Sequence, residues 1–133
     1  MVSPPPFVDV QVEGVPLATA FPVSSSAGEG LLLKNTDDSA LEVHVEVLQP
    51  TTGDLRGGAL PIPDVHWIKI VPDRFELPAH GEATCHVTLF IPGHRAYRRK
   101  YYQAMIWSHT EPMDGQGVGL SAGLISRLRF KTK

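Results

Sequence analysis

Three sets of residues in this sequence could carry chemistry, beginning with a serine between glycines. Gly119, Ser121 and Gly123 form the pattern G-x-S-x-G of a nucleophile elbow, in which a strand turns sharply into a helix and presents the serine. The residues after Gly123, LISRLRF, alternate as a strand does, and 133 residues are too few for an α/β-hydrolase. Small residues at alternate positions instead indicate close approach of a neighbouring strand or subunit. We therefore expect no catalytic residue here.

The second set is the histidines, whose spacing does not suit a strong metal site. The six are His44, His66, His80, His86, His94 and His109. None are separated as in H-x-H or H-x₃-H. His44 and His86 lie on the outward phase of their expected strands and could meet across a ladder, but a strong zinc site needs three or four ligands. We expect surface histidines, no metal and no cofactor.

The third candidate is Cys85, the only cysteine, so an intramolecular disulfide is excluded. It lies in phase with Ala83, Val87 and Leu89, on the apolar side of its expected strand. That position indicates a buried structural thiol and not a nucleophile. The sequence also has no glycine-rich phosphate loop leading into a helix. We expect that the protein is not an enzyme.

One cluster of basic residues lies between two expected strands. It contains His94, Arg95, Arg98, Arg99 and Lys100, and it is interleaved with Tyr97, Tyr101 and Tyr102. Basic and aromatic side chains together occur on single-stranded nucleic-acid platforms, but four full charges on a chain of net charge −2 are a weak electrostatic footprint. A solvated loop, or a docking patch for an acidic neighbour, is the better interpretation, and no nucleic-acid partner is expected.

Charge is distributed unequally along the chain. Residues 1–66 contain nine Asp/Glu and two Lys/Arg, a net charge of −7, whereas residues 67–133 contain five and ten, a net charge of +5; together these give the total of −2. Two interpretations remain open. The halves either complement each other between strands of one molecule, or they make a polar molecule that stacks head to tail.

Alternation of apolar and polar residues with a period of two predicts most of the chain as strands. Twelve prolines and twelve glycines suit short strands joined by many turns. The run at residues 30–34 is solidly apolar, as in a central strand buried on both faces. The expected strands are residues 7–13, 17–23, 30–34, 41–48, 67–71, 75–77, 82–91, 101–109 and 118–131. This pattern predicts an all-β, immunoglobulin-like antiparallel β-sandwich of seven to nine strands, with residues 1–6 as an extended Pro-rich arm and residues 7–133 as a single domain.

Several short motifs between about residues 30 and 130 carry a resemblance to a known family. They are Trp67-Ile68, the segment PDRFELP at residues 72–78, Gly81-Glu82, Ile91-Pro92, Lys100-Tyr101-Tyr102, Val118-Gly119-Leu120 and Ser126-Arg127-Leu128. On these segments the chain resembles the bacterial immunoglobulin-like domains of surface and secreted proteins, in the broad group that includes pilus-chaperone-like sandwiches. The resemblance implies a fold and an interaction or spacer role. It does not include the paired basic residues with which a pilus chaperone grips a subunit's C-terminus, so chaperone activity is not implied.

Three segments are expected to make protein contacts. Residues 49–66 form the longest irregular stretch, and ordered loops of this length tend to be functional. Within it we expect an apolar contact through Leu60, Ile62 and Val65. The basic cluster at residues 94–100 would meet an acidic surface, such as residues 37–46 of the next copy. The N-terminal segment at residues 1–13 would add a strand to a neighbour's sheet edge.

These features favour a non-catalytic structural or protein-binding module of a larger assembly, such as a surface filament, an envelope complex or a virion coat. The alternative is a monomeric recognition domain for a carbohydrate, a small ligand or a metal, using Trp67, Trp107 and nearby histidines. No segment approaches the roughly 20 apolar residues of a membrane span, so no membrane insertion is expected. We expect an extracellular or cell-surface location if a leader was removed.

Overall fold

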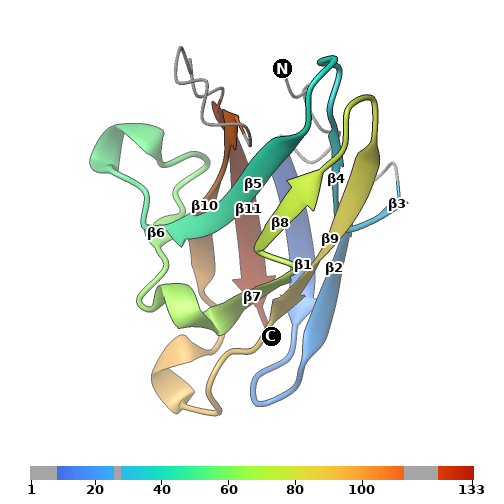
Figure 1. Ribbon diagram of the computed structural model, residues 1–133. Helices are drawn as coiled ribbons and strands as arrows, with labels where there is room; N and C mark the ends of the chain where they lie inside the picture. The colour runs from blue at the N-terminus through green and yellow to red at the C-terminus, as the bar shows by residue number, and fades with distance from the viewer. Residues whose placement is uncertain (1–8, 26–27, 113–122) are drawn as a thin grey trace.

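Eleven strands among the described residues form two facing sheets (Figure 1). The structure is a computed structural model that describes residues 9–25, 28–112 and 123–133. The first sheet contains, in spatial order, β1 (Asp9–Val15), β11 (Gly123–Thr132), β10 (Tyr101–Pro112), β5 (Leu41–Leu48) and β8 (Arg74–Leu77), and β6 (Leu60–Pro61) also pairs with β10. The second sheet contains β3 (Gly28–Glu29), β2 (Phe21–Ser25), β9 (Glu82–Leu89) and β4 (Leu31–Lys34), and β7 (Ile68–Val71) also pairs with β9. Three short 3₁₀ helices are η1 (Thr52–Asp54), η2 (Val65–Trp67) and η3 (Arg95–Tyr97).

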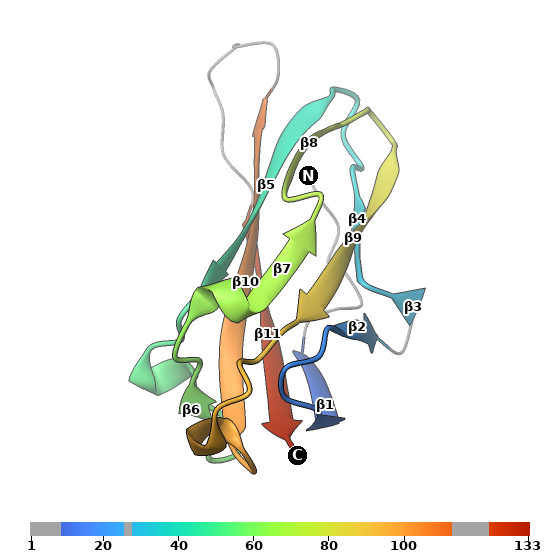
Figure 2. The same cartoon turned by 90° about the horizontal axis from the view of Figure 1, so that it is seen from below.

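The two sheets pack face to face, which confirms the predicted all-β sandwich (Figure 2). Most neighbouring strands are antiparallel, but β1 runs parallel to β11 and β6 runs parallel to β10. The number of strands exceeds the seven to nine expected. The main reason is that β3 and β6 have only two residues each, which is too few to produce an alternating pattern.

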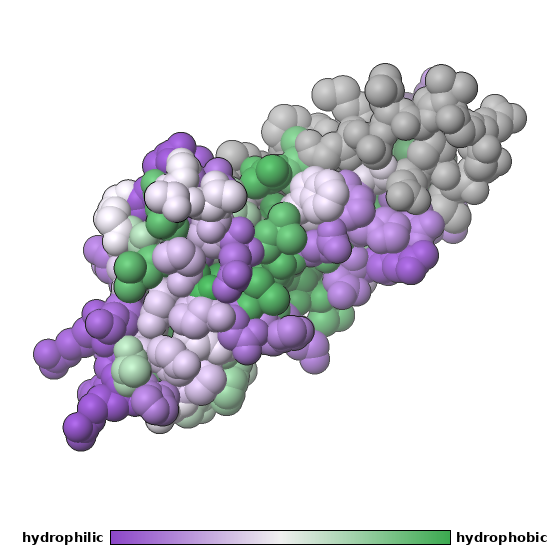
Figure 3. Space-filling model, turned by 90° about the vertical axis from the view of Figure 1, so that its left-hand side faces the viewer, coloured by the Kyte–Doolittle hydropathy of each residue, from purple (hydrophilic) through white to green (hydrophobic). Residues whose placement is uncertain are grey.

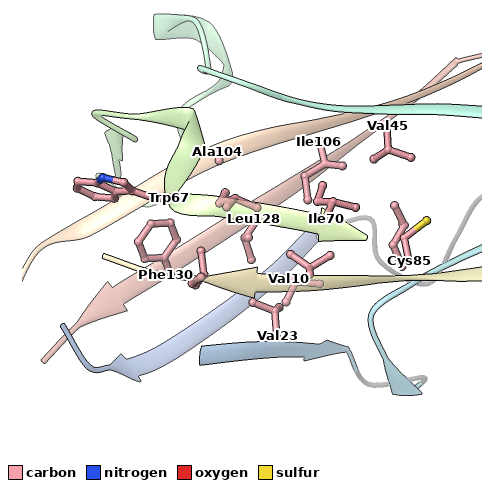
Figure 4. Close-up of a cluster of buried hydrophobic side chains, with 14 of the residues drawn as sticks. Val10, Val23, Val45, Trp67, Ile70, Cys85, Ala104, Ile106, Leu128 and Phe130 are labelled. Carbon is pink, nitrogen blue, oxygen red and sulfur yellow. The ribbon is translucent and has the colours of Figure 1, made fainter. Parts of the chain in front are cut away.

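The space between the sheets is filled by the apolar phase of each strand (Figure 4). Phe130 and Leu128 of β11 and Ile106 of β10 are fully buried on the inner face of the first sheet. Val23 and Ile70 approach them from the second sheet. Alternate residues of β10 and β11 therefore face the core, as a period of two predicts for strands.

Several predicted strands agree closely with the structure, and one was placed wrongly within its sheet. Residues 41–48 coincide with β5, and residues 75–77 and 101–109 lie inside β8 and β10. Residues 30–34, however, are not a central strand, because β4 pairs with β9 alone among the described strands. Leu31 and Leu33 face the core, whereas Leu32 between them is partly exposed. An unbroken apolar run thus arose from two core residues and one surface residue.

The irregular segment at residues 49–66 is held against the outer face of the first sheet by Gln103. The side chain of Gln103 is fully buried although it belongs to the outward phase of β10. Its Oε1 accepts the Arg56 backbone N–H at 2.9 Å, its Nε2 donates to the Asp54 carbonyl at 2.8 Å, and its own carbonyl accepts the Ile62 N–H at 2.9 Å. Both ends of one side chain amide therefore fix the loop to the sheet.

Between its described strands the chain passes from one sheet to the other six times: from β1 to β2, β4 to β5, β6 to β7, β7 to β8, β8 to β9 and β9 to β10. The crossing from β7 to β8 is short and runs through Pro72 and Asp73. The Asp73 carbonyl accepts the Val45 backbone N–H at 2.8 Å, which ties this crossing to β5. Because β8 has only four residues, it pairs with Leu41 to His44 and leaves the rest of that edge of β5 uncovered.

Truncating Phe130 to alanine should destabilise the fold far more than truncating a neighbour on the same strand. Phe130→Ala removes a fully buried ring, and we expect a loss of about 3–5 kcal/mol in the free energy of unfolding. Ile125→Ala is the matched control, since Ile125 is 60% exposed on the opposite face of β11, and we expect a change within about 0.5 kcal/mol. Urea unfolding measures both values. Equal losses for the two variants would contradict the assigned faces of β11.

Candidate protein-binding surfaces

Several opposite charges from the two halves of the sequence meet inside one molecule. On the outer face of the first sheet, Arg127 and Arg129 of β11 lie 3.1 and 3.2 Å from the carboxylate oxygens of Asp9 on β1. Arg74 of β8 lies 2.6 Å from Glu42 of β5, and its hydrogen bond lowers the pKa of that carboxyl group. These pairs support the interpretation of charge complementarity between strands. Each contributes little stability by itself, because the pairs are partly exposed to solvent.

The basic loop at residues 94–100 is different, because its cations are not paired with acidic side chains of the described residues. Arg95, Arg98, Arg99 and Lys100 are exposed, and the described residues provide no ion pair for any of them. The loop itself is well anchored. The Thr132 hydroxyl donates to the Tyr97 carbonyl at 2.6 Å and accepts the Lys100 N–H at 2.8 Å.

Aromatic packing holds the same loop against the core. The Tyr97 ring meets Trp67 edge-on at 4.6 Å and lies 5.5 Å from the ring of His94. The His94 side chain in turn accepts the Ala96 N–H at 3.1 Å. The loop therefore presents a fixed set of unpaired cations, and their use as a contact stays a prediction.

The three apolar residues predicted as a contact in residues 49–66 lie in different environments. Leu60 is 49% exposed, Val65 is partly buried, and Ile62 is fully buried in the core. Ile62 therefore supports the fold and is removed from the surface candidates. The sequence could not separate these residues, because an irregular loop has no periodicity that would mark its inner face.

An apolar surface on the outer face of the first sheet was indicated in the sequence only by the phase of Trp107. Met105 and Trp107 of β10 point outward, opposite Leu48 of β5 and Ile125 of β11 in the strand register. Leu48 is 39% exposed and Ile125 is 60% exposed. We call these four residues the outer patch. Figure 3, which views the side carrying β5 and β6, shows a band of apolar side chains between polar ones.

The histidines do not form a metal site among the described residues. His44 lies opposite His109 in the register of β5 and β10, and their rings stack at 5.1 Å. The expected meeting of His44 with His86 is wrong, because His86 belongs to the second sheet. Trp107 stacks on the other side of His109 at 4.0 Å. No group of three or more metal-ligating side chains with suitable geometry occurs in the described part of the chain.

Of the two candidate nucleophiles, the structure describes only Cys85, and this thiol is not available for chemistry. Cys85 is fully buried, and that burial, followed by the nearby Asp73 carboxylate, raises the pKa of its thiol to about 11. Its predicted role as a buried structural thiol is confirmed. Ser121 and most of its G-x-S-x-G motif lie outside the described residues.

A groove lies on the side of the sandwich where β5 and β7 approach each other from different sheets. It is lined by Val45, Glu46, Val47, Val65, His66, Ile68, Ile70 and Asp73, and we call it the edge groove. Its volume is about 250 Å³, which is below the range of about 300–1,000 Å³ typical of small-molecule sites. The size suits a few inserted side chains better than a cofactor.

Comparison with known proteins identifies the fold. No family model and no curated protein sequence matches the chain. Among solved structures, the whole chain aligns with an ASH/PapD-like domain of human CEP192 with a TM-score of 0.68 and 12% identity, over 84% of that domain. The fold is PapD-like and immunoglobulin-like. This confirms the predicted architecture and the resemblance to pilus-chaperone-like sandwiches at the level of fold.

Bacterial chaperone structures share the same fold. The periplasmic chaperone SfaE matches over the whole chain with a TM-score of 0.63 and 12% identity. A structure of the Salmonella enterica SafA pilin in complex with the SafB chaperone matches with a TM-score of 0.61 and 14% identity. The chain spans 57% and 55% of those two chains, so it corresponds to about half of each. In the part of the chain that the structure describes, no helix has the length and apolar character of a membrane span.

Cys85 should be inert in the folded protein and should lower stability at high pH. Its thiol titrates near pH 11 when folded and near its ordinary value of 9.0 when unfolded, so the unfolded chain loses the proton first. Between these values the free energy of unfolding must fall as pH rises, by about 2 kcal/mol from this group.

Comparison of the native protein with Cys85→Ala isolates this effect from other groups. We expect the difference in unfolding free energy between the two proteins to change by that amount from pH 9 to pH 11, measured by urea unfolding. A thiol reagent should modify Cys85 only as the protein unfolds. Rapid modification under native conditions would contradict the burial.

Proposed function

We propose that this chain is a non-catalytic structural or protein-binding module of a larger assembly, of the kind found in a surface filament, an envelope complex or a virion coat. The observation that carries the proposal is the outer patch. Leu48 and Ile125 are exposed, Trp107 is partly exposed, and Met105 beside them is 8% exposed. Large apolar side chains grouped on a surface mark contacts with other macromolecules more often than isolated ones do.

The structural neighbours support the same class of function. One of the matching structures holds a pilin together with its chaperone, and another is described as a periplasmic chaperone. A comparable sandwich in this chain would use its surfaces for protein contacts and not for catalysis. One of these neighbours is a periplasmic chaperone, which supports a location outside the cytoplasm; an extracellular or cell-surface location is proposed for the case that a leader is removed.

Three segments provide the proposed contacts. The basic loop, through Arg95, Arg98, Arg99 and Lys100, meets an acidic surface on the next copy, within residues 37–46. Leu60 and Val65 add an apolar contact. Residues 9–12 of the predicted arm pair with β11 of the same molecule, so the arm proposed to pair with a neighbour's sheet edge is limited to residues 1–8, which lie outside the described residues. Because the basic and acidic surfaces differ, each contact is heterologous and generates rings or filaments.

The alternative function, recognition of a carbohydrate, small ligand or metal by a monomer, has less support. Trp67 is 5% exposed and belongs to the core, so it cannot stack on a sugar. Trp107 is partly exposed and remains available, although one neighbour, His109, already stacks against it. Quenching of tryptophan fluorescence by a sugar would favour this alternative.

Reversing the charge of the basic loop should weaken self-association. We expect the native protein to form species heavier than its 14.5 kDa monomer at low salt and to dissociate as salt is added, because screening weakens contacts between exposed charges. The double variant Arg95→Glu/Arg98→Glu should stay monomeric. Light scattering over a range of concentration and salt measures the mass.

The matched control is Lys34→Glu/Lys69→Glu, which changes net charge equally on strands β4 and β7 of the second sheet and leaves the basic loop intact. It should associate as the native protein does. If the native protein is monomeric at every concentration, self-assembly is excluded and the partner must be a different protein. Equal weakening by both double variants would show a general charge effect and exclude a specific role of the loop.

A further inference from the structure

The edge groove lies where two sheet edges are both left open. Strand β8 pairs with β5 only as far as His44, so Val45 to Leu48 lie beyond that ladder. Strand β7 pairs with β9 and with no other described strand. Figure 1 shows β5 and β7 as neighbouring ribbons from the two sheets at this side of the sandwich. An open edge is a template for another strand.

The backbone groups of β7 that face this opening follow from one hydrogen bond. The Phe90 N–H donates to the Trp67 carbonyl at 2.7 Å, which continues the register between β7 and β9. In an antiparallel ladder, alternate residues direct both main-chain groups towards the partner strand. Lys69 therefore faces β9, whereas Ile68 and Ile70 face away from it.

Most of these outward groups are unpaired. The Ile68 N–H is bound to the Val65 carbonyl at the end of η2. For the Ile68 carbonyl and for both main-chain groups of Ile70, the described residues provide no partner. Strand β5 forms the opposite wall of the groove. Its Val45 N–H donates to the Asp73 carbonyl on the β8 side. Two residues further along, the main-chain groups of Val47 therefore point to the same side and face the opening.

The side chains around these groups form an apolar floor. Ile68 and Ile70 point inward from β7 and are 5% and 7% exposed, and Val47 and Val65 are partly buried against the same core. An added strand on β7 would place alternate side chains over this floor. A groove volume of about 250 Å³ leaves room for such side chains.

The rim of the groove is acidic. Glu46 and Asp73 line it, and Asp64 adjoins it beside His66. The Asp73 carboxylate has no hydrogen bond or ion pair with any described residue, whereas the nearest arginine in sequence, Arg74, is bound to Glu42. Charge complementarity therefore favours a cationic occupant.

We propose that the edge groove binds an extended segment of a partner protein as an added strand on β7, with apolar side chains at alternate positions and lysine or arginine beside them. The inference rests on the proposed function, because it names one binding site of that module. A second copy of this chain does not suit the groove. Docking groove to groove would bring two acidic rims together. The basic loop of a second copy is held in a 3₁₀ turn by Tyr97 and Thr132 and cannot extend into a strand.

Amide hydrogen exchange, followed by NMR, tests the open edge and its occupant directly. In the free protein the Ile70 amide should exchange fast, whereas the Lys69 amide, which faces β9, should be protected. The probes are synthetic peptides that alternate valine with threonine and end in either lysine or glutamate. The lysine-ended peptide should bind and slow exchange at Ile70, and the glutamate-ended peptide should not.

Substitutions locate the contact. Val47→Arg places a cation in the groove. Asp73→Lys reverses the charge of the unpaired carboxylate at the rim, and because Asp73 is exposed, this substitution should not unfold the protein. Each should weaken binding of the lysine-ended peptide about tenfold or more, which corresponds to about 1.4 kcal/mol. Val71→Arg is the control. It adds one positive charge, as Val47→Arg does, but on the outer face of the second sheet, where Val71 of β7 is 49% exposed. This variant should bind the peptide normally.

Two outcomes would overturn the proposal. One is that no peptide protects the Ile70 amide, and the other is that all three variants bind equally well. Neither outcome would overturn the proposed function, since the mass measurements on the basic loop test that separately. Conversely, the protein could prove strictly monomeric and still bind the lysine-ended peptide beside Ile70. Self-assembly through the basic loop would then be excluded, and the groove would stand as a binding site for a different protein.

Discussion

The apolar core of this protein depends on two sheets held face to face, and the chain joins them by crossing repeatedly between them. One of these crossings, from β7 to β8 through Pro72 and Asp73, ends the pairing along one edge of β5. Since β8 has only four residues, it covers about half of β5. The core behind it stays buried because Ile68 and Ile70 still point inward, but the main chain of both sheets is left open there.

Charge follows from the same arrangement of strands. The acidic strands β1 and β5 lie beside strands that carry arginine, so Asp9 meets Arg127 and Arg129, and Glu42 meets Arg74. The imbalance between the halves of the sequence is thus largely satisfied within one molecule. The cations of residues 94–100 are not, because their loop lies at one end of the sandwich and not beside an acidic strand.

Alternation within a strand is a local property, and for this reason it predicted β5 in both bounds and placed strands at residues 75–77 and 101–109, inside β8 and β10. Pairing between strands is not local. The edge position of β4, the burial of Ile62 and the burial of Gln103 all depend on segments far away in the sequence. Gln103 looked like an outward polar residue because nothing in its own strand shows that residues 51–61 cover it. The edge groove likewise depends on where β8 ends relative to β5.

The three candidate surfaces differ in position and in chemistry. The outer patch lies on a sheet face, the basic loop joins two strands at an end of the sandwich, and the edge groove lies between the sheets. The loop and the groove are not complementary to themselves: the loop is cationic, the groove has an acidic rim, and neither can pair with its own copy without bringing like charges together. A two-fold symmetric dimer is therefore disfavoured through the loop or the groove. Unlike surfaces on separate sides instead suit a module that contacts different neighbours at the same time.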